Sequence, residues 1–168
     1  MNTVETAMQD AFKAIGELTI EQENIECFWT DAQPLLEAHW REISAHADIP
    51  LKVDLRVYGE LEALNQLCII AARTSGRLVG YAVFFVSPHP HYKSSLQAQE
   101  DVIYMHPALR GMGHGRELLD ATERILRRRG CQMVHHHVKL AHPELGDLLA
   151  LNGYRAVETI FSKRLDRT

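Results

Sequence analysis

The 168-residue chain has no apolar run approaching the roughly 18–20 residues that a membrane-spanning helix needs. Residues 1–12 lack a basic stretch followed by an apolar core, so no secretory signal is expected there. There are only three cysteines, Cys27, Cys68 and Cys131, and they lie far apart, which predicts reduced thiols without a disulfide framework or a zinc knuckle. The sequence also has no internal repeat or low-complexity tract. These absences predict a soluble, cytoplasmic protein.

The composition, 46% hydrophobic and 24% charged, is that of an ordinary globular protein with a buried core. Its length predicts a single domain over residues 1–168. The net charge is −4, but residues 1–65 hold 13 acidic and 4 basic side chains, whereas residues 66–168 hold 9 acidic and 14 basic ones. Two interpretations stay open: the halves meet partners of opposite charge, or the surface is simply solvated unevenly.

Apolar periodicity and turn residues predict alternating helices and strands, and therefore a mixed α/β sheet. The predicted helices cover residues 3–15, 30–46, 57–66, 116–129 and 143–152. The predicted strands cover residues 20–29, 67–73, 78–87, 98–106 and 131–138, with a last strand or tight hairpin over 154–165. Thr30 and Gln33 have the spacing of a capping box at the start of the second helix. Two prolines predict a loop over residues 87–95.

The most informative segment runs from Asp101 to Arg116 and reads as a strand, a glycine-rich turn and the start of an amphipathic helix. Glycines let backbone N–H groups approach an anion, and the helix N-terminus adds the positive end of its dipole. Arg110 and Arg116 flank the turn with permanent charge, so a phosphate or pyrophosphate is the expected guest. The segment matches neither G-x-G-x-x-G nor a nucleotide P-loop. A glycine turn that binds nothing is the alternative.

The residues Met105-His106-Pro107, followed by Arg110-x-x-Gly113-x-Gly115, resemble the acyl-CoA pyrophosphate motif of the GNAT N-acetyltransferase superfamily. The resemblance covers residues 18–165, with residues 1–17 as a helical extension. It implies an α/β fold whose mostly antiparallel central sheet is splayed between the motif strand and the next strand, with helices on both faces.

The resemblance further implies acetyl-CoA as co-substrate. The turn would hold its pyrophosphate, and the strand ending at Tyr104 and Met105 would pair with pantetheine, while a backbone amide near Met105 would polarise the thioester carbonyl. The implied cofactor-binding residues are Tyr104, Met105, Arg110, Gly111, Met112, Gly113, His114, Gly115 and Arg116. In such enzymes the amine attacks the thioester directly, without an acyl-enzyme.

Direct attack needs a neutral amine and therefore a route for its proton. Asp101 occupies a position where many family members that act on small amines carry an acid, and Glu100 is adjacent. An ordinary strand-end carboxylate in solvent is the alternative for Asp101. Family members often carry a tyrosine that protonates the leaving thiolate, but Leu149 stands at that position here. Tyr104, His136, another nearby histidine or water would have to replace it, so the predicted catalytic residues are Asp101, Glu100, Tyr104 and His136.

Other charged and metal-binding patterns point to no further function. In the run of residues 135–137 only His135 and His137 can share a face of a strand, and no cysteine or carboxylate spacing supports a closed site, so no metal is expected. The arginines at residues 127–129 suit a helix C-terminus. Because the chain is acidic overall, no nucleic-acid partner is expected.

The sequence therefore predicts an acetyl-CoA-dependent N-acetyltransferase acting on a primary amine. The acidic front half favours a cationic small amine or a protein or peptide amine as acceptor. Two alternatives remain: a catalytically idle acyl-CoA-binding or regulatory protein with the same fold, and a phosphate-binding protein unrelated to CoA. A homodimer would be compatible with the apolar terminal segment.

Overall fold

The structure, a computed structural model, describes residues 16–46 and 48–166, so the helix predicted over residues 3–15 lies outside the described residues. A five-stranded sheet has the order β1-β2-β3-β4-β5. Its strands are β1 (Leu18–Glu23), β2 (Leu67–Thr74), β3 (Arg77–His89), β4 (Tyr92–Met105) and β5 (Met133–His135). The first four pair antiparallel, and β5 pairs parallel to β4.

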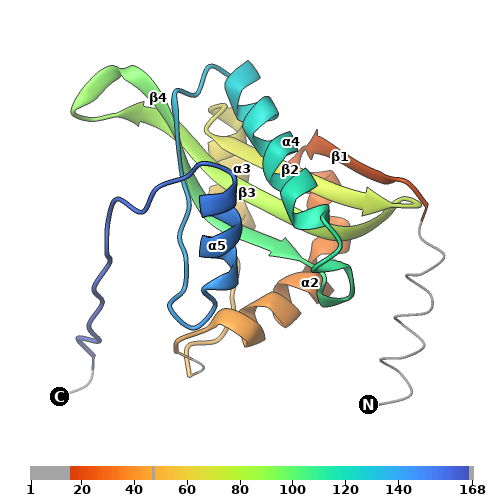
Figure 1. Cartoon of the computed structure of the whole chain (residues 1–168). Coiled ribbons are helices and arrows are strands. Elements are labelled where there is room, and N and C mark those ends of the chain that lie inside the picture. The colour runs from red at the N-terminus through yellow and green to blue at the C-terminus, as the bar shows by residue number, and fades with distance from the viewer. Residues whose placement is uncertain (1–15, 47, 167–168) are drawn as a thin grey trace.

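Helices cover both faces of the sheet (Figure 1). On one face lie α2 (Ile25–Ile43) and α3 (Leu55–Ala63), and on the other lie α4 (His114–Arg128) and α5 (Glu144–Leu151). A short 3₁₀ helix, η1 (Pro107–Leu109), leads from β4 toward α4. The predicted fold class, a mostly antiparallel mixed sheet between two helical layers, is confirmed.

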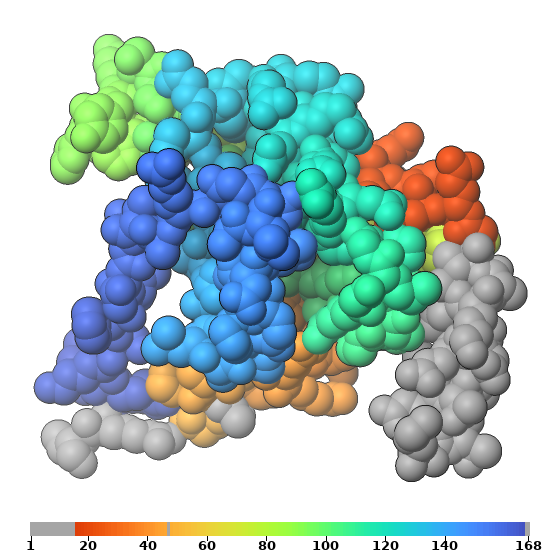
Figure 2. Space-filling view, in the orientation of Figure 1, coloured from red at the N-terminus to blue at the C-terminus, as the bar shows by residue number. Residues whose placement is uncertain are grey.

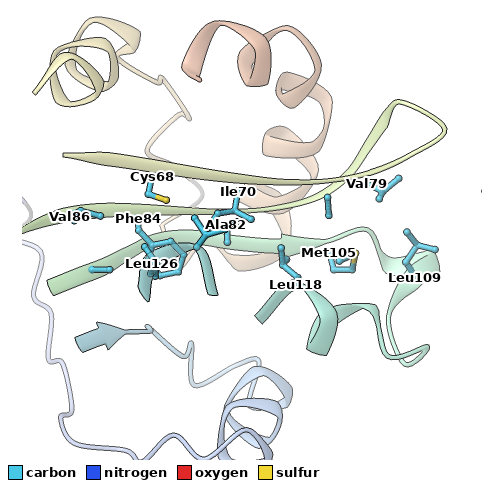
Figure 3. Packing of buried hydrophobic residues seen from close by; sticks show 13 residues of the cluster. Cys68, Ile70, Val79, Ala82, Phe84, Val86, Met105, Leu109, Leu118 and Leu126 are labelled. Carbon is cyan, nitrogen blue, oxygen red and sulfur yellow. The ribbon is translucent and has the colours of Figure 1, made fainter. Parts of the chain in front are cut away.

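Two apolar clusters hold these layers to the sheet. Figure 3 shows the first, in which Phe84, Met105, Leu118 and Leu126 pack between the sheet and α4. The second lies on the opposite face, where Phe28 of α2 meets the ring of Tyr81 edge-on at 5.4 Å between centroids. Seven of the eight residues of β2 are buried, as expected for a strand in the middle of a sheet that is covered on both sides.

The first helix of the core begins earlier than predicted. Asn24 is its N-cap, with the side-chain oxygen accepting a hydrogen bond from the backbone N–H of Cys27 at 2.8 Å. The strand predicted over 20–29 therefore ends at Glu23, and the capping box predicted at Thr30 is wrong. Pro34 lies inside this helix, where burial of the helix face outweighs the lost backbone hydrogen bond.

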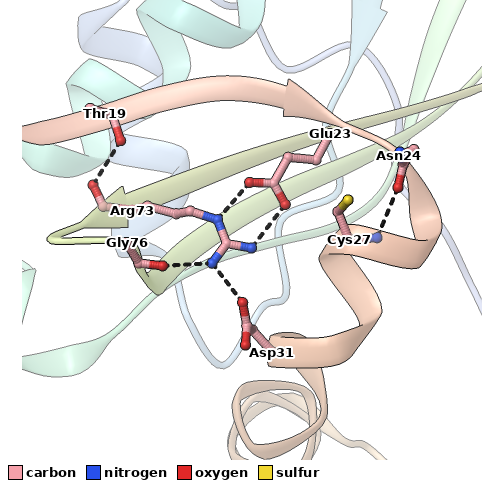
Figure 4. Close-up of polar contacts among 7 residues, drawn as sticks. All are labelled: Thr19, Glu23, Asn24, Cys27, Asp31, Arg73 and Gly76. Atoms are coloured by element: carbon pink, nitrogen blue, oxygen red, sulfur yellow. Dashed lines mark hydrogen bonds and ion pairs between the residues drawn. The ribbon is translucent and has the colours of Figure 1, made fainter.

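A largely buried arginine fixes β1 and α2 to the central strands. Figure 4 shows the Arg73 guanidinium donating to both oxygens of Glu23, at 2.6 and 2.9 Å, and to Asp31 at 2.7 Å. It also donates to the carbonyl of Gly76 in the β2–β3 turn. The Arg73 side chain is only 17% exposed, so these carboxylates compensate a largely desolvated charge. The network thus orients the start of α2, whose far end borders the site described below.

Three further predictions need correction. Residues 87–95 form the end of the β3–β4 hairpin instead of a loop, because Pro90 suits the turn between the paired residues His89 and Tyr92. The strand predicted over 131–138 is shortened to Met133–His135, since the chain leaves β4 afterwards. Residues 154–165 form neither a strand nor a hairpin. Among the described residues, no helix has the length and apolar character needed to cross a bilayer.

Candidate active site

A β-bulge interrupts β4 at Asp101. The register pairs Phe84 with Glu100 and Val83 with Val102, so Asp101 is an extra residue without a partner on β3. An extra residue in one strand reverses the alternation of side chains beyond it. The bulge therefore decides which of the predicted catalytic side chains share a face of the sheet.

Asp101 and Tyr104 lie on the α2–α3 face, and Glu100 lies on the other. The Asp101 carboxylate accepts a hydrogen bond from the hydroxyl of Tyr58 on α3 at 2.6 Å, and Tyr104 belongs to the apolar cluster under α2. Glu100 bonds instead to His136, whose ring packs against Phe84 in the α4-side cluster. Without a bulge, Glu100 and Tyr104 would share a face and Asp101 would lie opposite them.

The surroundings of Asp101 favour its neutral form more than water does. Burial raises the pKa of the Asp101 carboxyl, although the hydrogen bond from Tyr58 and the charge of His137 lower it in part. Burial, followed by the contact with Asp101, raises the pKa of the Tyr58 hydroxyl, which therefore stays a donor. A carboxylate with a raised pKa accepts a proton more readily than an ordinary aspartate.

The sheet opens next to the bulge. Only Gln97–Gln99 of β4 pair with Met133–His135 of β5, while β4 itself continues to Met105. Along residues 100–105, no described strand pairs with β4 on its β5 side. Backbone N–H and C=O groups on such an edge can pair with an extended ligand as an added strand would. Tyr104 and Met105 lie at the far end of this edge, next to the glycine turn.

The glycine turn leads directly into the N-terminus of α4. Gly111 and Gly113 have φ values of +75° and +93°, which favour glycine over residues that carry a side chain. The first N–H beyond Arg110 that donates to a described backbone carbonyl is that of Arg116, to Gly113 at 3.0 Å. An added Cβ at Gly113 would meet no atom within 4 Å, so the turn faces open space. Turn N–H groups and the helix dipole together form a site suited to an anion.

The other predicted cofactor residues of this turn have exposed or weakly held side chains. Met112 is 61% exposed. His114 lies 3.3 Å from a carboxylate oxygen of Glu117, and the largely exposed Arg116 lies 3.9 Å from Asp120. Gly115 packs beside α5. Backbone groups, more than these side chains, are therefore the groups available to an anion at this turn, and anion binding stays a prediction.

Arg110 is predicted to contact a phosphate, but its side chain bonds to a carboxylate of the protein. Its guanidinium makes two hydrogen bonds to the carboxylate of Glu42, at 2.6 and 2.8 Å, and its Nε donates to the carbonyl of Met105 at 2.8 Å. It also lies over the ring of Tyr104, 5.4 Å from the centroid. The hydrogen bond from Arg110 holds the pKa of Glu42 below its usual range. The Arg110 guanidinium is thus paired with Glu42 at the end of α2. Contact between Arg110 and a phosphate stays a prediction.

Glu100 and His136 form a buried, hydrogen-bonded pair at the point where β4 and β5 separate. His136 Nδ1 is hydrogen-bonded to the Glu100 carboxylate, and the two side chains are only 2% and 4% exposed. The His136 ring packs edge-on against Phe84 and against Tyr154. Its Nε2 is buried and has no partner among the described residues. A carboxylate that holds one ring nitrogen and leaves the other free is an arrangement suited to proton transfer.

No hydroxyl stands where the resemblance would place a tyrosine. Leu149 occupies that position on α5, and it is buried. Tyr154, which follows α5, contacts the His136 ring on the same side of the sheet. Burial raises the pKa of the Tyr154 hydroxyl, so that it stays protonated.

Tyr104 is the end of an aromatic stack under α2. Its ring lies 5.5 Å from that of Tyr81 and 4.9 Å from that of His39, and the Tyr81 hydroxyl is 3.0 Å from His39 Nδ1. Burial lowers the pKa of His39 to about 4, so its ring is neutral at pH 7. Tyr104 is itself 4% exposed. These rings pack against the face of β4 that α2 covers. A catalytic role for the Tyr104 hydroxyl stays a prediction.

The neighbouring histidines bind glutamines of β4. His135 Nε2 lies 3.2 Å from Gln97 Oε1, and His137 Nε2 lies 2.7 Å from Gln99 Nε2. Within residues 16–46 and 48–166, no group of three histidine, cysteine or acidic side chains is arranged to hold a metal ion.

The Acetyltransferase (GNAT) family profile matches residues 29–145. The chain belongs to the GNAT acetyltransferase family. No curated protein matches the sequence. The family assignment confirms the resemblance carried by the turn after β4.

Solved structures similar to this GNAT chain share its fold. An aminoglycoside acetyltransferase from an uncultured soil metagenomic sample has a TM-score of 0.71 and 16% identity, covering 90% of this chain and 97% of its own. A ribosomal-protein-alanine N-acetyltransferase from Brucella melitensis biovar Abortus 2308 has a TM-score of 0.68 and 19% identity, covering 89% and 99%. A predicted acetyltransferase from Clostridium acetobutylicum, determined with acetyl-CoA, has a TM-score of 0.66 and 13% identity, covering 89% and 97%.

Two residues of this GNAT site were missed from the sequence. Tyr58 bonds to Asp101 and Glu42 bonds to Arg110, over separations of 43 and 68 residues. Both come from helices that the sequence predicted without any indication of these contacts. A stripe predicts the buried face of a helix, but it does not predict which polar neighbour of that stripe reaches a distant strand.

Proposed function

We propose that this protein is an acetyl-CoA-dependent N-acetyltransferase that acts on a primary amine by direct attack on the thioester. The observation that carries the proposal is the continuity of two features: the free edge of β4 over residues 100–105 and the glycine turn at the start of α4. An extended ligand with a pyrophosphate at one end would pair with the edge and place its phosphates on the turn. The family membership and a related fold determined with acetyl-CoA support this assignment.

The turn fits a pyrophosphate. Open space lies over Gly111 and Gly113, where added Cβ atoms would meet nothing within 4 Å, and the N-terminus of α4 points its dipole there. Arg116 supplies a positive charge at the same helix end. The backbone of Tyr104 and Met105 would hold the arm that links this anion to the thioester.

Asp101 is the proposed acceptor of the amine proton. In the reaction, the amine nitrogen forms a bond to the acetyl carbon, the carbon–sulfur bond breaks, and the nitrogen loses one proton. Asp101 lies at the bulge where β4 and β5 separate, is partly buried and has a raised pKa. Tyr58 holds its carboxylate in one orientation at 2.6 Å. The carboxylate would also attract the amine in its cationic form.

His136 is the proposed donor to the leaving thiolate, replacing the hydroxyl that Leu149 lacks. When His136 is protonated and Glu100 ionised, Nδ1–H donates to the carboxylate and Nε2–H is free to donate to sulfur. Its unpartnered buried Nε2 supports this role, since His135 and His137 are already engaged by glutamines. Asp101 and His136 then return to their starting protonation states through solvent.

A cationic acceptor is favoured by the charge of the face that carries Asp101. The helices over this face, α2 and α3, come from the front of the chain, where residues 1–65 hold 13 acidic and 4 basic side chains. Substrates of that charge are attracted to such a surface before they bind. Small polyamines and the amines of proteins or peptides both fit this requirement.

Titration calorimetry with acetyl-CoA, CoA and ADP tests the cofactor site. We expect micromolar binding, about −8 kcal/mol, that requires the pantetheine arm. Gly113→Ala should weaken acetyl-CoA binding at least tenfold. Gly76→Ala is the matched control, because Gly76 also has a positive φ and open space around its Cβ position but lies in the β2–β3 turn. Equal binding by both variants would contradict the proposal.

The alternative of an idle acyl-CoA-binding protein is favoured by one observation, the buried Leu149 at the position of the usual tyrosine. Thiol release from acetyl-CoA, measured across a panel of amines, separates the two functions. Turnover that is lost in His136→Ala but retained in Leu148→Ala supports the enzyme with His136 as proton donor. Tight binding without turnover of any amine supports the idle protein.

A further inference from the structure

A hollow on the outer side of α2 has no part in the proposed reaction. It has a volume of about 670 Å³ and lies between α2 and residues 48–53, a segment that contains neither helix nor strand. Ligand sites in proteins usually have volumes of roughly 300–1,000 Å³. The sequence contains two tryptophans, Trp29 and Trp40, and both line this hollow. We call it the tryptophan hollow.

The two tryptophans lie on one face of α2, beside the face that is buried. Phe28 and His39 are buried against the sheet, and each is followed in the sequence by a tryptophan. Consecutive residues of a helix point about 100° apart, and eleven residues make about three turns. Trp29 and Trp40 therefore share a face that is turned away from the core, and both are partly buried.

The tryptophan hollow and the candidate active site lie on different sides of α2. The ring of His39 lies 4.9 Å from that of Tyr104 on the sheet side, whereas the next residue, Trp40, lines the hollow. The described residues that line the hollow do not include Asp101 or Tyr104. A ligand held between α2 and residues 48–53 would therefore leave the place beside Asp101 open to an amine.

The lining combines apolar walls with charged side chains. Beside the indoles, the apolar side chains that line the hollow are those of Leu36, Pro50, Leu51 and Val53. The polar side chains in the lining are those of Gln33, Glu37, Arg41 and Asp48. An apolar concave surface with a small number of charged groups is typical of a site for an amphiphilic small molecule.

Carboxylates outnumber guanidinium groups around the tryptophan hollow. Glu37 lies 3.3 Å from Arg41, and both side chains are largely exposed. Asp48 accepts a hydrogen bond from Arg164 at 3.1 Å, and the same guanidinium also bonds to Asp166. Figure 2 shows this end of the chain next to the segment that follows α2. Three carboxylates against two guanidinium groups favour a positively charged ligand.

The chemistry of the lining selects among cations. The indole ring is the aromatic side chain that attracts a cation most strongly over its face. Glu37 and Asp48 each have an arginine partner, so they supply negative charge at a distance more than a direct hydrogen bond to a ligand. A primary ammonium ion is strongly hydrated and needs such bonds. A quaternary ammonium ion needs no hydrogen-bond acceptor and can bury its alkyl groups against apolar walls.

We propose that the tryptophan hollow binds a small organic cation of the quaternary ammonium class. The positive charge would lie against the rings of Trp29 and Trp40, and the alkyl groups would contact Leu36 and Leu51. Because such a cation has no hydrogen on nitrogen, it is no acceptor for N-acetylation. The tryptophan hollow is thus a second site, and its test does not depend on acetyl-CoA.

Intrinsic fluorescence tests the proposal directly, because both tryptophans of the chain line the hollow. The full chain is titrated with choline at constant ionic strength, and in parallel with 3,3-dimethylbutan-1-ol, a neutral alcohol of the same shape in which carbon replaces the nitrogen. We expect a saturable change with choline at a Kd of about 1 mM, and binding of the alcohol weaker by about tenfold or more.

Exposed charges around the hollow give variants that do not threaten the fold. Glu37→Gln should weaken choline binding about threefold, and Arg41→Gln should strengthen it by a similar factor, because each changes the charge near the cation. Glu60→Gln and Arg127→Gln are the matched controls. Both residues belong to exposed i,i+4 ion pairs like that of Glu37 and Arg41, but they lie on α3 and α4. Neither control should change the Kd.

Two further variants locate the bound cation. Trp40→Leu should abolish the response of the remaining tryptophan to choline, with folding checked by circular dichroism. Asp101→Asn should leave the Kd for choline unchanged, since Asp101 lies across α2 from the hollow. A response that does not saturate, equal binding of the neutral alcohol, charge variants that match their controls, or loss of binding in Asp101→Asn would each overturn the proposal.

Discussion

Glu100 and Asp101 are adjacent carboxylates in one strand, and the two faces of the sheet give them different surroundings. Glu100 is closed off with His136 between the sheet and α4, where the two side chains are 4% and 2% exposed. Asp101 is only partly buried, under α3, where its partner is the neutral hydroxyl of Tyr58. The alternation of side chains along the strand separates the two carboxylates, and the bulge at Asp101 brings Tyr104 to the face that carries Asp101.

The difference teaches how one strand can combine stability with reactivity. A buried hydrogen-bonded pair is costly to break, because the partner that remains is left without a hydrogen bond away from water. A partly buried carboxylate held by a hydroxyl keeps its orientation while it can still exchange a proton. The Glu100 side therefore joins β4 to the segment after β5, and the Asp101 side carries the proposed base. The predictions below test this contrast, starting with the largest expected effect.

Glu100→Ala should lower the free energy of unfolding by about 4 kcal/mol, because it leaves His136 buried without its partner. Asp101→Ala should cost about 1 kcal/mol, since it removes one hydrogen bond at a partly exposed position. Urea denaturation followed by circular dichroism measures both. The double variant Glu100→Met/His136→Phe should recover most of the loss, as apolar replacements of buried pairs often do. Equal losses in the two single variants would refute the contrast.

The α2 face contains a second buried group, His39, whose titration is visible in the stability of the protein. Burial lowers its pKa from 6.5 to about 4; the charge of Glu42 opposes this shift, and Arg110, Lys139 and His142 add to it. Between these pH values the unfolded chain binds one proton more than the folded one. Stability from this group is therefore present above pH 6.5 and lost as pH falls toward 4, by about 3 kcal/mol.

His39→Gln tests this dependence, since glutamine can still bond to Tyr81 but does not titrate. Carboxylates also titrate in this window, so the quantity to compare is the difference between the unfolding free energies of wild type and variant. That difference should shrink by about 3 kcal/mol from pH 7 to pH 4. A difference that is constant with pH would show that His39 is protonated equally in both states.

Asp101→Asn should lower kcat/KM for the amine about 100-fold or more, the usual effect of removing a positioned base. The dissociation constant of acetyl-CoA should change less than twofold, because the turn after β4 is untouched. Asp147→Asn, at an exposed position on α5, is the control for the loss of one charge. Steady-state thiol release and calorimetry separate the two effects. Unchanged kcat/KM in Asp101→Asn would remove the proposed base.

The sequence predicted the site motif because the motif is local. A strand, a glycine turn and a helix start within residues 101–116 leave a direct signal, and their helix and turn are found where expected. The β2–β3 hairpin was likewise predicted from its Thr-Ser-Gly-Arg turn, and short helices were predicted near α3 and at α5, the latter ended by Gly153. In each case the deciding interactions lie within a few residues.

The features missed are those set by distant contacts. The bulge at Asp101 depends on how β4 meets β3, and alternation read along one strand cannot reveal it. The start of α2 was placed too late because Asn24, a good N-cap, follows a run that reads as a strand. The terminal segment reads as a strand but has no partner in its own chain, so propensity alone misplaced it.

The smallest expected effect comes from the hydroxyl that holds the proposed base. The hydrogen bond from Tyr58 stabilises the ionised form of Asp101 and lowers its pKa, against the larger opposing effect of burial. Tyr58→Phe removes this bond and should move the pKa of Asp101 further upward. Since the base acts when ionised, the acidic limb of the pH profile of kcat/KM should move to higher pH, with little change at alkaline pH. A limb that stays in place while the alkaline rate falls would mean that Tyr58 positions Asp101 without tuning its protonation.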